Sequence, residues 1–318
     1  MTRKDWQDFS RGIAFISPWI VGVLAFTLLP VALSLYYSFC DYSLLQSPLW
    51  VGTENYRELM RDDDFWRTLR NTGYYAMVAL PAGLMVSVGL ALLLNQNIRG
   101  QSVYRTIIFL PSLVPVVASS MLWMWIFNAK LGLLNHVLSF CGIEGQIQFS
   151  WLNHLLGLQG GDMIQPLTMP PPWLDDARTA MPALIMMSIW GVGNAVVIYL
   201  AGLQDVPREL YEAADIDGAN GWQRLRNVTL PMISPVIFFN LVMGIIGSLQ
   251  TFATAYIMTG GGPAKATYFY TMYLYDNAFS YLRMGYASAM AWIQLLIVLV
   301  LTAVAFWSSK RWVHYQGK

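Results

Sequence analysis

The sequence predicts an all-α membrane protein with six transmembrane helices, and two observations lead to this expectation. Hydrophobic residues make up 56% of the 318 residues and charged residues only 12%, whereas soluble domains carry about 25% charged residues. Six apolar stretches lack Asp, Glu, Lys and Arg, and each has roughly the 20 residues that a helix needs to cross a bilayer. They cover residues 12–39, 72–94, 107–127, 182–203, 233–258 and 285–307.

The first stretch follows the charged residues Arg3, Lys4 and Asp5. It is longer than the apolar region of a signal peptide and has no small-residue cleavage site, so we expect a retained helix. Prolines occur inside several stretches, among them Pro81 and Pro235. Membrane helices tolerate proline because neighbouring helices satisfy the freed carbonyl groups, and kinked helices suit a protein that rocks between two states.

An even number of spans places both termini on the same side of the membrane. Eleven of the 19 basic residues lie in the termini and in the second and fourth loops: Arg3, Lys4, Arg11, Arg99, Arg105, Arg208, Arg224, Arg226, Lys310, Arg311 and Lys318. The positive-inside rule therefore predicts that both termini and these two loops are cytoplasmic.

These spans and loops suggest two regions of the chain. Residues 1–70 would comprise the N-terminal cytoplasmic segment, the first span and an external loop, and residues 71–318 a core of five spans. The core carries an external insertion at about 128–178 and a cytoplasmic loop at 205–231. The insertion could contact a soluble partner, or it could have no role in transport, and the sequence leaves both readings open.

The cytoplasmic loop at 205–231 begins with a predicted short helix. Asp205 is suited to an N-cap, and Pro207 is tolerated in a first helical turn. Four residues recur at helical spacing and are expected on one face, namely Leu210, Ala213, Ala214 and Asp217. The two alanines on this face would let another surface approach closely.

The rest of this loop predicts a turn and a second short helix. Gly218 is suited to end the first helix in a left-handed cap, and Asn220 to start the second. Leu230-Pro231 is then expected to turn the chain into the fifth span. The product would be a helix–turn–helix knob joined to two spans, which could convert a push from a partner into a tilt of those spans.

The loop carries Glu212-Ala213-Ala214, then Asp217-Gly218-Ala219, then Leu230-Pro231, with Pro235 after them. This order and spacing resembles the EAA loop of ABC importer permeases, and we call residues 205–231 the EAA-like loop. A second match follows the fifth span, where Thr259-Gly260-Gly261-Gly262-Pro263 resembles the TGGGP element of carbohydrate-type permeases, in the subunit similar to the larger maltose permease.

The resemblance implies a type I ABC importer permease fold and a bacterial cytoplasmic (inner) membrane location. It implies four kinds of partner: a second homologous permease subunit, an ABC ATPase dimer, an extracytoplasmic solute-binding protein and a sugar substrate, an oligosaccharide or sugar derivative. The ATPase-coupling residues would be Glu212, Ala213, Ala214, Asp217, Gly218, Ala219, Leu230 and Pro231.

Uncharged polar side chains inside the fourth and fifth spans are candidates for a sugar path, because hydroxyl-rich ligands need both donors and acceptors. Our candidates are Trp190, Asn194, Ser248, Gln250, Thr251 and Tyr256. In the maltose-type permease the corresponding stretch of the fifth span contributes asparagines to the sugar site, and Ser248 and Thr251 match those positions. Packing between helices is the alternative role for each residue.

Other function classes fit the sequence less well. The chain has no P-loop and no HExxH or nucleophile-elbow motif, so we expect no enzyme activity and no cofactor in this chain, with ATP and Mg²⁺ bound by the partner ATPase. A net charge of +1 gives no sign of nucleic-acid binding. An ion-coupled secondary transporter is the alternative, but such carriers usually place ionisable residues within their spans.

Overall fold

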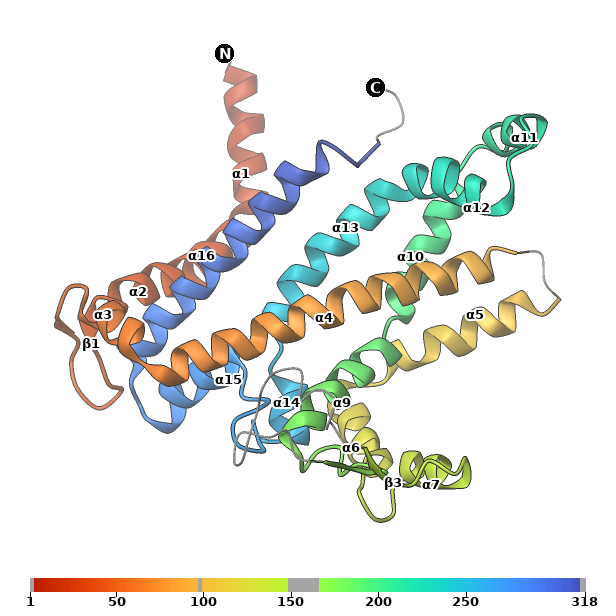
Figure 1. Cartoon of the computed structure of the whole chain (residues 1–318). Coiled ribbons are helices and arrows are strands. Elements are labelled where there is room, and N and C mark those ends of the chain that lie inside the picture. The colour runs from red at the N-terminus through yellow and green to blue at the C-terminus, as the bar shows by residue number, and fades with distance from the viewer. Residues whose placement is uncertain (1–2, 97–98, 148–165, 315–318) are drawn as a thin grey trace. The chain divides into compact units, whose positions relative to one another are not determined.

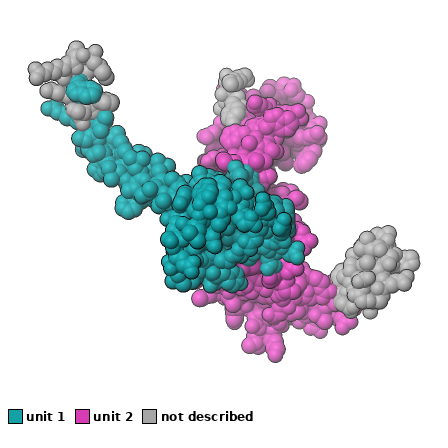
Figure 2. Space-filling model, turned by 90° about the vertical axis from the view of Figure 1, so that its left-hand side faces the viewer, with its two compact units in different colours: residues 1–66, 273–297 teal, residues 67–272, 298–318 magenta. Residues whose placement is uncertain are grey.

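The computed structural model describes residues 3–96, 99–147 and 166–314, which form helices and two short hairpins (Figure 1). Contacts group the chain into two units, coloured teal and magenta in Figure 2: residues 1–66 with 273–297, and residues 67–272 with 298–318. The division at residue 70 made from the sequence stays a prediction. Residues 148–165 of the expected external insertion lie outside the described residues.

The first unit contains the first span and the external loop after it. Its elements are α1 (Arg3–Val23), the π-helical turn η1 (Leu24–Leu28), α2 (Leu29–Tyr37), strands β1 (Cys40–Asp41) and β2 (Leu49–Trp50), α3 (Glu54–Arg61), the π-helical turn η5 (Asp276–Ser280) and most of α16 (Met284–Ser309). Helix α1 and the turn η1 expose apolar side chains such as Phe15, Trp19 and Phe26. An outward-facing apolar surface of this kind is what a lipid-facing span requires.

One end of this unit is held by hydrogen bonds from the segment after the first span. The Asn55 amide donates to the carbonyl oxygens of Ser38 and Cys40, each at 2.9 Å. The backbone also approaches closely here, because a side chain at Gly285 would collide with the Cys40 carbonyl oxygen. The start of α16 is therefore closely packed against the end of the first span.

Asp62 makes a second set of hydrogen bonds at the same end of this unit. Its half-buried carboxylate accepts hydrogen bonds from the hydroxyls of Tyr273 and Tyr286, and from the amide of Asp64 at 2.9 Å. Burial raises the pKa of Asp62, but these hydrogen bonds outweigh burial and the pKa lies below its usual value. Burial, together with the bond to Asp62, raises the pKa of Tyr273 to about 12.

The second unit contains the remaining spans and both long loops. Its elements are α4 (Asp63–Leu94), α5 (Gln101–Phe109), the 3₁₀ turn η2 (Leu110–Leu113), α6 (Val116–Ile126), α7 (Leu133–Phe140), β3 (Gly145–Ile147), β4 (Leu167–Met169), α9 (Ala177–Trp190), α10 (Gly193–Gln204), α11 (Arg208–Ile216), α12 (Gly221–Arg224), the π-helical turn η4 (Leu225–Thr229), α13 (Leu230–Leu249), α14 (Ala253–Met258) and α15 (Tyr270–Tyr275). Strands β3 and β4 pair antiparallel, as do β1 and β2 of the first unit.

The all-α class and the six apolar stretches are confirmed, although two of the spans are broken. Four helices are long and apolar enough to cross a membrane, and two bent pairs bring the number to six. The third stretch bends by 99° between η2 and α6, where Val114 is extended before Pro115, the conformation that a following proline favours. The fourth bends by 45° between α9 and α10.

The fifth stretch also differs from its predicted limits. One continuous helix runs from Gly221 to Leu249, so the span begins within the EAA-like loop. It ends earlier than expected, and the backbone between Gln250 and Phe252 is not helical before α14 begins at Ala253. The polar residues predicted for the sugar path therefore fall on both sides of a break.

The glycine-rich element after α14 packs against the start of the second span. Gly260 and Gly261 take positive φ angles of 58° and 85°, which only glycine adopts readily. The hydroxyls of Thr259 and Thr267 lie 2.6 Å apart. The Asn71 amide donates to the Lys265 carbonyl oxygen at 2.8 Å, so the element is fixed to α4.

Replacing Asp62 with asparagine tests the hydrogen bonds that its carboxylate accepts. The depressed pKa of Asp62 means that its stabilisation is present above its usual pKa and is lost as the pH falls below about 4. Tyr273 has a raised pKa, so its stabilisation is lost as the pH rises beyond about 10. We expect D62N to lower the unfolding free energy by about 1 kcal/mol at pH 7 and to flatten the acid limb of the thermal midpoint measured against pH.

The matched control for D62N is D63N, because Asp63 is the exposed neighbouring carboxylate at the start of α4. D63N should keep the acid limb of the wild-type profile. An unchanged profile in D62N would show that the Asp62 hydrogen bonds do not stabilise this end of the protein.

Candidate functional site: the EAA-like loop and the cavity between the spans

Helix α11 forms the first half of the EAA-like loop and is largely exposed. It begins at Arg208 after Pro207 and has no side-chain N-cap. The predicted N-cap Asp205 is instead the C-cap of α10, so that expectation was wrong, because the chain turns at Val206 and Pro207 between the two helices. Glu212 and Ala213 are exposed on α11.

The turn after α11 confirms the role expected for Gly218. Its φ is +72°, and the two hydrogen bonds of a Schellman motif close the helix. The Ala219 amide donates to the Ala214 carbonyl oxygen at 2.9 Å, and the Gly218 amide to that of Asp215 at 3.1 Å. The carbonyls of Ala214 and Asp215 therefore have partners within the turn.

The second half of the loop begins with a capping box. The Asn220 side chain accepts from the Gln223 amide at 2.9 Å, and the Gln223 side chain accepts from the Asn220 amide at 2.7 Å. The expected turn at Leu230-Pro231 is absent, because α12, η4 and α13 form one helix. The π-helical turn directly before Pro231 widens the helix where proline lacks a donor.

Three contacts fix α11 to the spans beside it. Arg224 forms an ion pair with Asp215 at 2.7 Å, and the hydroxyls of Tyr211 and Thr229 lie 3.1 Å apart. The Tyr211 ring also packs on a hydrophobic cluster of buried residues from α4, α10 and α13, namely Ala91, Leu94, Val196, Tyr199, Leu200, Leu203, Val206 and Ile233. We call this set the loop-end cluster. Figure 1 shows α11 and α12 at one end of α10 and α13.

The exposed side of the knob also carries apolar side chains. Ile216 is 86% exposed and Trp222 66% exposed. Large apolar residues on a protruding and otherwise polar loop indicate a protein-binding surface. The loop thus combines a free surface with a rigid attachment to two spans.

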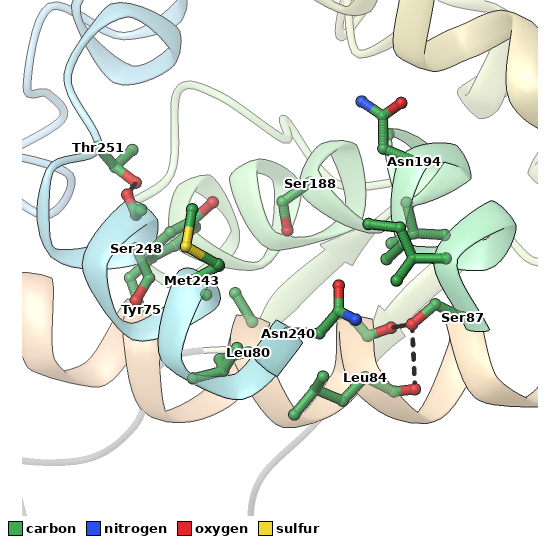
Figure 3. A pocket seen from close by; sticks show the side chains of 18 residues that line it. Tyr75, Leu80, Leu84, Ser87, Ser188, Asn194, Asn240, Met243, Ser248 and Thr251 are labelled. Atoms are coloured by element: carbon green, nitrogen blue, oxygen red, sulfur yellow. Dashed lines mark hydrogen bonds between the residues drawn. The ribbon is translucent and has the colours of Figure 1, made fainter. Parts of the chain in front are cut away.

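A cavity of about 400 Å³ lies between α4, α9, α10 and α13 of the second unit. Its polar lining includes Tyr75, Ser87, Ser188, Asn194, Asn240, Ser248 and Thr251. Figure 3 shows Ser188 and Asn240 facing the same space from different helices. We call this space the Ser248 cavity.

The hydroxyls of the Ser248 cavity donate to carbonyl oxygens of their own helices. Ser248 donates to Ile245 at 3.1 Å and Ser188 to Ile185 at 2.7 Å. Each of these oxygens keeps acceptor capacity toward the cavity. None of the described lining residues carries a formal charge, and the described residues hold no cluster of His, Cys, Asp or Glu suited to a metal ion.

A second cavity of about 220 Å³ shares Tyr75, Ser188 and Asn194 with the first. Trp190 lines this second cavity, and its ring meets that of Trp123 edge-on at 5.9 Å. Four of the six residues predicted for the sugar path thus line one or both cavities, and these are Trp190, Asn194, Ser248 and Thr251. Gln250 and Tyr256 line neither.

Tyr75 lines the Ser248 cavity but was not among the predicted sites, and Asn240, a polar residue of the fifth span, lines it as well. Tyr75 lies on α4, and its hydroxyl interacts with Ser188 and Thr251. Asn240 is an amide within the apolar α13, and it donates to the Val236 carbonyl oxygen at 3.0 Å. Both are polar residues within apolar stretches, which is the only sequence signal that identifies them.

Comparison with known proteins agrees with this arrangement. The family model described as "binding-protein-dependent transport system inner membrane component" matches residues 79–314. The probable ABC transporter permease protein YesP of Bacillus subtilis is 39% identical over 100% of this chain and 96% of its own. The sulfoquinovosyl glycerol transport system permease protein SmoG of Agrobacterium fabrum is 33% identical over 94% of this chain and 90% of its own.

The fold is also similar to that of a solved importer. In the crystal structure of a bacterial ABC transporter involved in the import of the acidic polysaccharide alginate, one chain superposes with a TM-score of 0.78. That match covers 97% of this chain and 99% of the other at 24% identity. This protein therefore belongs to the family of binding-protein-dependent transport system inner membrane components, the multi-pass permease subunits of ABC importers.

Proposed function

We propose that this chain forms half of the translocation pathway of an ATP-driven importer for a carbohydrate, an oligosaccharide or sugar derivative. The observation that carries the proposal is the EAA-like loop, whose exposed α11 surface is tied to α10 and α13. A second permease would complete the pathway. An ATPase dimer would dock on the loop and supply the ATP and Mg²⁺, so this chain itself would be neither an enzyme nor a cofactor protein.

Coupling would proceed through the loop as a rigid lever. Closure of the ATPase dimer moves the docked α11, with Glu212, Ala213 and Asp217 on or beside the docking surface. The loop-end cluster and the Tyr211–Thr229 contact pass this motion to α10 and α13. Because these helices also line the Ser248 cavity, their tilt would change access to it. In this proposal the EAA-like loop and both termini lie in the cytoplasm, on the side where the ATPase would dock.

The substrate class rests on the cavity and on the relatives. Hydroxyl and amide groups without formal charge suit a ligand that presents many hydroxyls. Relatives named for lactose transport in Rhizobium radiobacter and for trehalose/maltose transport in Thermococcus litoralis are 32% and 29% identical. A solved alginate transporter of similar fold is in complex with a periplasmic protein bound to an alginate pentasaccharide, which supports an extracytoplasmic binding protein as a partner here.

Co-purification tests the proposed assembly. The chain extracted from its native membrane in mild detergent should retain an ATPase and a second permease that mass spectrometry identifies. Uptake by the purified assembly in proteoliposomes should require ATP on the side of the membrane that the ATPase faces. It should also require a sugar-loaded binding protein on the opposite side. A chain that is reproducibly free of any ATPase would refute the proposal.

Gly218 offers a test of the loop with a matched control. Its φ of +72° makes alanine cost about 1 kcal/mol at this position, so G218A should distort the turn and reduce uptake about fivefold while the protein remains in the membrane. Gly221 lies three residues away, has equally open space around it and lacks a positive φ. Uptake in G221A should match wild type, and equal activity of both variants would contradict the lever mechanism.

Thr251 tests the Ser248 cavity. T251V removes one hydroxyl at nearly constant volume. It should raise the half-saturating concentration for uptake of the sugar that the binding protein delivers about fivefold, the effect of losing roughly 1 kcal/mol. Basal ATP hydrolysis should not change. The control is T106V, because Thr106 bonds to its own helix at 3.0 Å but lines neither cavity. Identical kinetics of T251V and wild type would exclude Thr251 from the sugar path.

A further inference from the structure

Arg105 is a charged residue for which neither the coupling loop nor the sugar path has a use. It lies in the second turn of α5, and its Nε is buried without a hydrogen-bond partner among the residues that the structure describes. A buried guanidinium N–H without an acceptor is costly, so a site of this kind is normally completed by a group that accepts its hydrogen bond, such as an anion.

Arg105 lines a partly open space of about 220 Å³ between α5 and α10, which we call the Arg105 cavity. The rest of the lining is apolar except for Gln204, and it comprises Leu94, Ile108, Phe109, Gly193, Val196, Val197, Leu200 and Ala201. Arg105 and Gln204 therefore provide the only side-chain hydrogen-bond donors of this lining, and both suit an anionic oxygen.

Gly193 explains why the two helices leave this space. An added Cβ at Gly193 would lie 2.6 Å from the Ile108 carbonyl oxygen and 3.0 Å from the Cα of Phe109, so α5 and α10 touch there through their backbones. Figure 1 shows the two helices separating from that crossing toward their ends at Gln101 and Gln204. Most residues that line the Arg105 cavity lie on these two helices, between the crossing and those ends.

The position of the cavity points to a lipid. Gln204 is the last residue of α10, directly before the EAA-like loop, so the cavity lies where the spans meet the head groups of one leaflet. The outer face of α5 is apolar and exposed at Val103, Ile107 and Leu110. Acyl chains would cover that face while a phosphate reaches Arg105, as in basic pockets between membrane helices.

We propose that the Arg105 cavity binds the phosphate group of an anionic phospholipid of the leaflet that surrounds the EAA-like loop. The guanidinium and the Gln204 amide donate to the phosphate oxygens, and the bound head group joins α5 to α10 next to the loop. The proposal is independent of the carbohydrate substrate and requires only that the chain is a membrane permease.

Native mass spectrometry of the detergent-purified complex tests the site with phosphatidylglycerol and phosphatidylcholine as probes. We expect one phosphatidylglycerol to be retained in preference to phosphatidylcholine. R105Q should weaken its retention about fivefold or more, the effect of removing one basic contact. R99Q is the matched control, because Arg99 is exposed in the turn before α5 and is absent from the cavity lining, and its lipid retention should match wild type.

A second variant keeps the test valid if R105Q does not insert. V197W fills the cavity from α10 without changing charge, since Val197 is 46% exposed and lines it, and it should displace the same lipid. Competition by inorganic phosphate with no preference for phosphatidylglycerol would identify a free-anion site and overturn the lipid proposal. Loss of a protein subunit instead of lipid in R105Q would show that a partner carboxylate completes the site, which also overturns it.

Discussion

The action of the EAA-like loop on the spans depends on the loop-end cluster, the hydrophobic contact of α4, α10 and α13 on which Tyr211 of α11 packs. Burying one large apolar side chain contributes about 1.5–3 kcal/mol, whereas a single hydrogen bond such as Tyr211–Thr229 contributes about 1 kcal/mol. The cluster therefore supplies the stiffness, and the hydrogen bond sets the orientation of α11 on it. Without the cluster, a push on the exposed surface would bend the loop and leave the spans in place.

The same dependence explains why the fifth span begins inside the loop. A turn at Leu230-Pro231 would have separated the knob from α13 by a flexible joint. The continuous helix from Gly221 to Leu249 removes that joint, and the π-helical turn before Pro231 accommodates the proline without breaking the helix. Helix α13 is also held by a residue that follows α16, because the Ser234 hydroxyl of α13 accepts a hydrogen bond from the His314 amide at 2.9 Å.

The turns of the EAA-like loop were predictable from sequence because they depend on neighbouring residues. The Ser248 cavity was only partly predictable because it depends on how distant helices pack together. Gly218 and Asn220 act on their own turns, and the structure shows the left-handed cap and the capping box that these residues favour. Hydropathy located the six apolar stretches, but it averages over a window and cannot place the 99° bend before Pro115 or the end of α13 at Leu249. Tyr75 was missed because its role depends on which face of α4 meets α9 and α13. Gln250 and Tyr256 were included because they are polar, although neither lines a cavity.

The lining of the Ser248 cavity bears on how a permease with no charge in its spans could work. Ser188, Asn240 and Ser248 each donate to a carbonyl oxygen of their own helix, so these three side chains keep a hydrogen-bond partner when no ligand is present. A ligand would meet acceptors that are already partly engaged, and its contacts would be weak and similar in strength. Weak contacts suit a pathway that must release what it admits. Weak contacts alone would not drive uptake, because a ligand shifts a conformational equilibrium only by its differential affinity for the two states. In the mechanism proposed here, the energy therefore enters at the other end of α10 and α13, through the surface of α11.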